Sequence, residues 1–232
     1  MDGVPTPALA EPRRESKVWW RSIYFTSPVV LLIAFAPYTS LIFYLYQVLR
    51  RLGLHDNLWQ ISSVGVFFVQ VSFLVLIVLF WEWKPLTSIG AHPPKLIDLK
   101  WGVLAFVIIQ AGDVFWFSAT LPLGGSTQAQ TQLATWSSQS ESWKIILAIS
   151  ASFFEEFYFR GYVIERVEEI TGSMALGAIL GTALDLYLHS VYWDTSFVIS
   201  IAFSEFSLAL LYLWSRSAAS CIIAHFLLDA LR

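Results

Sequence analysis

The sequence has little charge and almost no cysteine. Of its 232 residues, 13% are Asp, Glu, Lys or Arg and 56% are hydrophobic, whereas a soluble domain carries about 25% charged and about 45–50% apolar residues. This composition excludes an ordinary soluble globule, a disordered chain and a nucleic-acid-binding protein with a basic face. The single cysteine, Cys221, excludes a disulfide within the chain and a metal site built from several thiolates. A mean hydropathy of +0.62 points to a chain that crosses a membrane several times.

Long runs without charge predict the membrane-spanning helices. Residues 22–49 and 57–81 contain no Asp, Glu, Lys or Arg, and each run exceeds the roughly 20 residues that a spanning helix needs. We predict an all-α polytopic membrane protein of about seven transmembrane helices. The expected organisation is a polar N-terminal tail over residues 1–24 and a single transmembrane domain over 25–232, with a catalytic core at about 100–231. The five further spans, which all contain ionisable residues, are expected at 101–120, 142–166, 174–193, 195–214 and 217–231.

Lys and Arg near the span ends favour one orientation. Most of them fall on the side that holds the N-terminus, which the positive-inside rule places in the cytoplasm. We therefore expect a multi-pass integral protein of the plasma (inner) membrane with a cytoplasmic N-terminus. The first residues are rich in proline and arginine and lack the apolar segment of a signal peptide.

Ionisable residues inside the later spans mark the candidate site. Each costs roughly 2.5–3.5 kcal/mol to insert, so several together indicate a function by default. Glu156 and Arg160 are four residues apart and can pair on one helix face. Glu155 is rotated by about 100° from Glu156 and needs another partner. Glu205 and Asp113 belong to no local pair or motif, and we expect them to be structural or to line a cavity.

Two later spans each carry a carboxylate and an imidazole one helical turn apart. Asp185 and His189 share one face, and so do His225 and Asp229. At about 1.5 Å of rise per residue, Glu155 and both histidines fall in one zone about 10 Å deep in the middle of the membrane. A carboxylate with two neutral imidazoles can bind a divalent metal or activate a water molecule directly. The residues alone leave both chemistries open.

The order of these residues resembles a known family. A double glutamate with an arginine four residues after its second member, an intramembrane histidine and a final His-x-x-x-Asp are similar to the CPBP family (CAAX proteases and bacteriocin-processing enzymes, also called the Abi family), which includes the type II CAAX prenyl endopeptidases. The resemblance extends from about Lys100 to Asp229. It implies an intramembrane endopeptidase. The best-known members of the family remove the last three residues of prenylated CAAX proteins.

The resemblance implies a role for each matching residue. Glu155 matches the glutamate that activates the attacking water, and His189 matches its partner. His225 matches the histidine of the third motif, and Asp229 stands where Asn or Asp helps to stabilise the oxyanion. If a divalent metal such as zinc takes part, the predicted ligands are Glu155, His189 and His225. The implied partners are the lipid bilayer and a membrane-associated peptide or protein substrate, without nucleic acid.

The remaining motif positions carry supporting roles. Glu156 and Arg160 match an accompanying structural pair. Asp185 departs from the family, which usually has Phe four residues before the histidine, and Asp185 can orient His189 or serve as an extra ligand. This departure also keeps open a scaffold that has lost its activity. The functional alternative is a non-enzymatic transporter or ion-handling protein that uses the same carboxylates and histidines.

Overall fold

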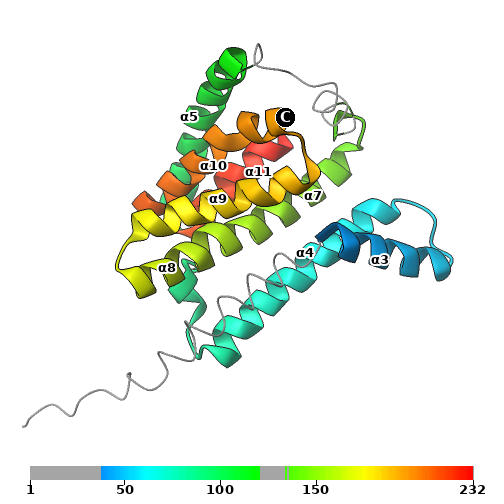
Figure 1. Cartoon of the computed structure of the whole chain (residues 1–232), viewed down its shortest axis with the longest axis horizontal. Coiled ribbons are helices and arrows are strands. Elements are labelled where there is room, and N and C mark those ends of the chain that lie inside the picture. The colour runs from blue at the N-terminus through cyan, green and yellow to red at the C-terminus, as the bar shows by residue number, and fades with distance from the viewer. Residues whose placement is uncertain (1–37, 121–133, 135, 232) are drawn as a thin grey trace, which may run out of the picture.

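The protein is helical throughout the part of the chain that the structure describes. The computed structural model describes residues 38–120, 134 and 136–231, and their regular elements are α-, π- and 3-10 helices (Figure 1). This confirms the expected all-α, membrane-like fold. The elements are α3 (Tyr38–Arg51), α4 (Leu58–Leu76), η3 (Ile77–Trp81), η4 (Leu86–Ile89), α5 (Leu96–Thr120), α7 (Glu141–Glu155), η6 (Glu156–Val163), α8 (Ile164–Thr171), α9 (Met174–Tyr192), α10 (Thr195–Ser215) and α11 (Ala218–Ala230).

Four helical stretches among the described residues are long and apolar enough to cross a membrane, and each coincides with a predicted span. They are Leu58–Trp81, Leu96–Trp116, Met174–Val191 and Phe197–Ser215.

The other three predicted spans have different outcomes. The span predicted at 22–49 falls mostly outside the described residues, as does the polar tail 1–24, and α3 covers its end. The span predicted at 217–231 corresponds to α11, which is apolar but shorter than a full crossing. The span predicted at 142–166 corresponds to the continuous run of α7, η6 and the start of α8, which carries the ionisable groups.

The helix that carries the double glutamate changes its winding at the motif. Ser140 begins α7 by accepting a hydrogen bond from the backbone N–H of Trp143, at 3.4 Å. At Glu156 the α-helix gives way to the π-helix η6, which runs to Val163 before α8 resumes α-helical winding. Such π segments are rare and frequently lie at functional sites. The change separates Glu155, the last residue of α7, from Glu156, the first residue of the π-helix.

Glycines allow the helices α9 and η4 to approach η6 and α8 closely. A Cβ atom on Gly161 would lie 2.6 Å from the backbone oxygen of Ile89, and one on Gly181 would lie 2.7 Å from that of Phe159. A Cβ atom on Gly177 would lie 2.8 Å from the backbone oxygen of Ile164. Real Cβ atoms do not approach oxygen this closely. Contact between backbones therefore sets the position of α9 and of its acidic and imidazole side chains.

Two apolar clusters surround the polar centre. One joins α4 to α7 and η6, where the rings of Phe67 and Phe154 lie 5.2 Å apart. The other joins α5, α10 and α11 around Tyr212. In Figure 1 these three helices pack together, and α9 lies in front of α11, while α3 and α4 form a hairpin beside α7. The polar centre thus lies inside a bundle of α7, η6, α9, α10 and α11.

A buried ion pair links Glu82, the residue that follows η3, to Arg166 of α8. Glu82 accepts two hydrogen bonds from Arg166, at 2.9 Å from Nε and 2.6 Å from Nη2, and one from the Tyr162 hydroxyl at 2.8 Å. Glu82 and Arg166 are 1% and 2% exposed, so each depends on the other for compensation of its charge.

Candidate active site

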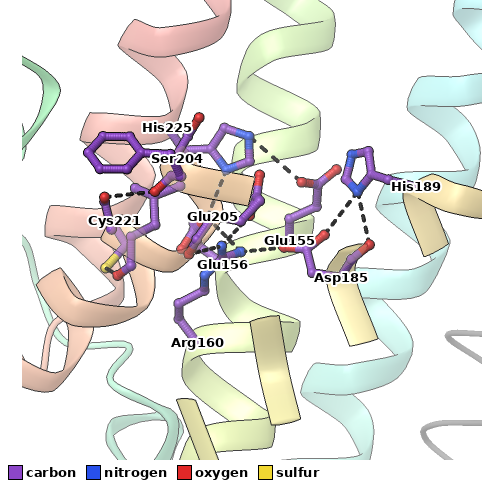
Figure 2. A network of polar contacts seen from close by, with 12 residues as sticks. Glu155, Glu156, Arg160, Asp185, His189, Ser204, Glu205, Cys221 and His225 are labelled. Atoms are coloured by element: carbon purple, nitrogen blue, oxygen red, sulfur yellow. Dashed lines mark hydrogen bonds and ion pairs between the residues drawn. The ribbon is translucent and has the colours of Figure 1, made fainter. Parts of the chain in front are cut away.

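Five helical segments bring ionisable side chains to one place. Figure 2 shows most of them pointing toward a common centre between the helices. The contributing residues are Glu155 from α7, Glu156 and Arg160 from η6, Asp185 and His189 from α9, Glu205 from α10, and His225 and Asp229 from α11.

Glu155 lies between the two imidazole rings (Figure 2). Its Oε2 atom is 3.7 Å from Nε2 of His225. On the other side, one ligand atom from each of Glu155, Asp185 and His189 lies within 4.8 Å of the others. The Glu155 side chain is 14% exposed, so it is reachable from outside, whereas the neighbouring His225 side chain is 7% exposed. The structure thus brings together the three residues expected to converge, while their catalytic roles stay predictions.

His189 is oriented by the residue one turn before it. Its Nδ1 atom lies 3.0 Å from the backbone oxygen of Asp185 and 3.2 Å from the Oδ1 atom of the same residue. A carbonyl oxygen can only accept, so Nδ1 carries a proton and Nε2 of the neutral ring keeps its lone pair. The ring lies beside the Glu155 carboxylate, and its side chain is 22% exposed. His189 therefore has the tautomer of a base or a metal ligand at Nε2.

His225 is oriented from the opposite side by Glu156. The Nδ1 atom of His225 lies 2.7 Å from Oε1 of Glu156, which is fully buried. This contact directs Nε2 toward Glu155, at 3.7 Å, and toward Oδ2 of Asp229, at 3.4 Å. Glu156 therefore does more than pair with an arginine, because it also fixes the ring of His225.

Arg160 connects the two carboxylate–imidazole pairs. Its Nη1 atom lies 3.2 Å from Oε1 of Glu156 and donates to Oδ2 of Asp185 at 2.7 Å. Its Nη2 atom donates to the carboxylate of Glu205 and, at 3.1 Å, to the Glu205 backbone oxygen. Arg160 is 1% exposed, and a buried charge of this kind needs such partners. The predicted pair of Glu156 and Arg160 is present, within a larger network.

Glu205 is the member of this network that sequence reasoning did not connect to the site. It pairs with an arginine 45 residues away, and no local spacing in the sequence signals that contact. The neighbouring Ser204 donates to both carboxylate oxygens of Asp113 at 3.0 Å. Asp113 thus has a partner on α10, and its expected structural role stays a prediction.

A donor group for a metal lies beside the predicted one. The prediction combined Glu155 and His189 with His225, whose Nε2 atom lies 3.7 Å from Oε2 of Glu155, and that set stays a prediction. In the part of the chain that the structure describes, the grouped ligand atoms come from Glu155, Asp185 and His189. Two carboxylates and an imidazole are a donor set that first-row divalent metals accept, so these residues fit a metal ion.

This arrangement provides the groups that hydrolysis requires. Glu155 is a partly exposed carboxylate beside His189. When the ring is neutral, its Nε2 lone pair and this carboxylate can together take a proton from water. His225 and Asp229 lie together on the other side of that carboxylate, where a developing oxyanion could be held.

Comparison with known proteins supports the same reading for the C-terminal part of the chain. No curated protein and no solved structure matches the chain. A family model does match, over a stretch that contains all eight residues of the cluster, from Glu155 to Asp229. This match confirms the resemblance and supports a protease of the CAAX type in general terms. Residues 138–231 are thus similar to the family of Rce1-like type II CAAX prenyl endopeptidases.

Proposed function

We propose that the protein is an intramembrane endopeptidase that hydrolyses a peptide bond of a membrane-associated substrate. The observation that carries the proposal is the position of Glu155, a partly exposed carboxylate between two imidazoles inside a buried polar centre. A carboxylate in this position can act as a general base toward a water molecule. Cleavage inside a helix bundle suits a substrate that is already anchored in the bilayer.

Glu155 and His189 are the residues that activate the water molecule in this mechanism. Asp185 holds Nδ1 of His189 protonated through its backbone oxygen, so Nε2 can accept a hydrogen bond from the water. Glu155 takes the proton as the oxygen attacks the peptide carbonyl, and it then delivers that proton to the leaving amine. Because Asp185 and Arg160 are buried and bonded to each other, His189 has a fixed support during this step.

His225 and Asp229 stabilise the oxyanion of the tetrahedral intermediate in this mechanism. Glu156 holds the His225 ring so that Nε2 faces the centre. Because the Glu156 carboxylate accepts the proton on Nδ1, Nε2 donates to the tetrahedral intermediate in the imidazolium form of the ring. Asp229 lies 3.4 Å from the same nitrogen and is 24% exposed, so it can contact substrate as well as the ring. Asp229 donates to an oxyanion only in its protonated form.

The proposed substrate class follows from the matched family description. A prenylated peptide that ends in a CAAX sequence is held at the membrane by its lipid, which places the scissile bond near the helix bundle. We therefore propose prenylated CAAX peptides as the first substrates to test.

The test is cleavage of a farnesylated CAAX peptide by the full chain in proteoliposomes. Glu155→Gln keeps the shape of the side chain but removes the base, and the cleavage rate should fall by about 10²–10⁴-fold. Glu141→Gln is the matched control, because Glu141 lies on the same helix, its side chain is 80% exposed, and it pairs with Lys144 away from the cluster. Equal cleavage by wild type and Glu155→Gln would overturn the proposal.

The same proteoliposomes also test the alternative of a transporter. An ion-handling protein would show proton or cation flux that depends on Glu155, without peptide cleavage. The proposed hydrolase instead gives cleavage that does not require an ion gradient.

A further inference from the structure

We propose that Glu155, Asp185 and His189 bind one first-row divalent cation, with Asp185 as a direct ligand. The inference deepens the proposed function and rests on it for its setting, because the three residues lie within the proposed hydrolytic centre. It differs from the donor set that the motifs suggest, in which His225 takes the place of Asp185. Three protein ligands would leave further coordination positions for water, which is typical of a catalytic rather than a structural metal.

An unsatisfied carboxylate oxygen on Asp185 is the first sign of a bound cation. The residue is fully buried, and its Oδ2 atom accepts a hydrogen bond from Arg160 at 2.7 Å. Among the described residues its Oδ1 atom has no hydrogen-bond partner, although Nδ1 of His189 lies only 3.2 Å away. That N–H is directed instead at the backbone oxygen of Asp185. A buried, charged acceptor in this state has lost its hydration without compensation, and a cation at Oδ1 would remove that cost.

The hydrogen bond at Nδ1 of His189 leaves Nε2 as the nitrogen that can bind a metal. Because the backbone oxygen of Asp185 fixes the proton on Nδ1, the lone pair of the neutral ring is at Nε2. Metal-bound histidines commonly donate their other N–H to a carbonyl or a carboxylate, which orients the ring and fixes this tautomer. His189 therefore already has the outer hydrogen bond that a metal ligand needs.

The distances between the three donor residues also fit a single metal ion. One ligand atom from each of Glu155, Asp185 and His189 lies within 4.8 Å of the other two. Two ligands at about 2.0–2.2 Å from one metal ion can be at most about 4.4 Å apart. Shifts of a few tenths of an ångström in the side chains would close the group around an ion. The imidazole nitrogen favours a zinc-like ion over magnesium or calcium, which prefer oxygen ligands.

The net charge of the buried cluster also favours a bound cation. Glu156, Asp185 and Glu205 all contact the guanidinium of Arg160, and Glu155 lies beside them without a contact to that group. Even with His225 protonated beside Glu156, four carboxylates against one guanidinium and one imidazolium leave an excess of negative charge in a buried setting. Buried charges are normally paired or bound to metals, and a divalent ion beside Glu155 and Asp185 would offset this excess. When bound, it would take the Nε2 lone pair of His189, so the attacking water would be held by the ion, a Lewis acid, in place of that nitrogen, and Glu155 would still take the proton through its second oxygen.

The test is Co²⁺ binding by the purified full chain after chelator treatment, followed by visible absorption and titration calorimetry. We expect one Co²⁺ ion per chain, with d–d absorption bands of a mixed nitrogen–oxygen site. Asp185→Asn should weaken Co²⁺ binding at least tenfold. Glu141→Gln is the matched control, because Glu141 lies on α7 like Glu155 but is exposed, pairs with Lys144 and is not in the donor group, and its Co²⁺ affinity should stay within about twofold of wild type.

Glu155→Gln provides a second variant if Asp185→Asn does not fold, since Glu155 has no contact with Arg160, and it too should weaken Co²⁺ binding at least tenfold. Absence of stoichiometric Co²⁺ binding, or equal affinities for Asp185→Asn and Glu141→Gln, would overturn the metal site. Cleavage that survives complete chelation together with absent Co²⁺ binding overturns the metal site but leaves the proposed hydrolase. Intact Co²⁺ binding without any peptide cleavage overturns the proposed function but leaves the metal site.

Discussion

Replacement of Arg160 by methionine removes the guanidinium that holds three buried carboxylates. Glu156, Asp185 and Glu205 are at most 5% exposed as whole residues, and each lies within ion-pair distance of Arg160. Breaking a buried ion pair by removing one partner costs about 3–5 kcal/mol, because the other charge remains buried and uncompensated. Since three partners lose their cation together, we expect Arg160→Met to reduce the free energy of unfolding by at least about 3 kcal/mol.

The matched control is Arg216→Met. Arg216 also pairs with two glutamates, Glu165 at 3.2 Å and Glu168 at 2.9 Å, but its side chain is 44% exposed. Exposed ion pairs contribute about 0–1 kcal/mol, so this variant should stay within about 1 kcal/mol of wild type.

The assay is reversible unfolding in mixed micelles with increasing SDS, followed by fluorescence of the 11 tryptophans. Adding Glu205→Gln to Arg160→Met should recover part of the lost stability, because it removes one uncompensated charge. The reasoning would be refuted if Arg160→Met and Arg216→Met had equal, small effects.

Two further predictions concern the packing of the π-helix and the oxyanion group. Gly161→Ala places a Cβ atom 2.6 Å from the backbone oxygen of Ile89, and this overpacking should cost about 1–3 kcal/mol in the same unfolding assay. A fully tolerated alanine would show that the close contact is not required. Asp229→Asn should retain cleavage within about tenfold of wild type, because an amide can donate to the oxyanion. Asp229→Leu removes that donor and should lower the cleavage rate by about 10²–10³-fold, and equal rates for the two variants would contradict this role for Asp229.

The helical fold was predictable because charge is excluded from lipid-facing helices. The charge-free run 57–81 corresponds closely to the apolar stretch Leu58–Trp81, and the later spans at 174–193 and 195–214 are recovered as α9 and α10. The π-helix could not be predicted in this way. No spacing or composition signal in Glu156–Val163 separates π from α winding, and the close backbone contact at Gly161 that accompanies the wider winding is formed with a distant segment.

The convergence of the site was partly predictable from depth along the helices. Rise per residue places Glu155, His189 and His225 in one zone, and the structure brings them together. Depth carries no information on how each helix is rotated about its axis. For that reason the contacts of Arg160 with residues 25 and 45 positions away, and the grouping of Asp185 rather than His225 with the metal donors, required tertiary structure.

The central claim is that Glu155 activates water to hydrolyse a peptide bond at the membrane. The most direct measurement is mass spectrometry of a farnesylated CAAX peptide after incubation with the reconstituted protein in H₂¹⁸O. The account predicts a new C-terminal carboxylate that contains one ¹⁸O atom from wild type, and at least about a hundredfold less of this product from Glu155→Gln. Labelled product formed equally by both proteins would contradict it.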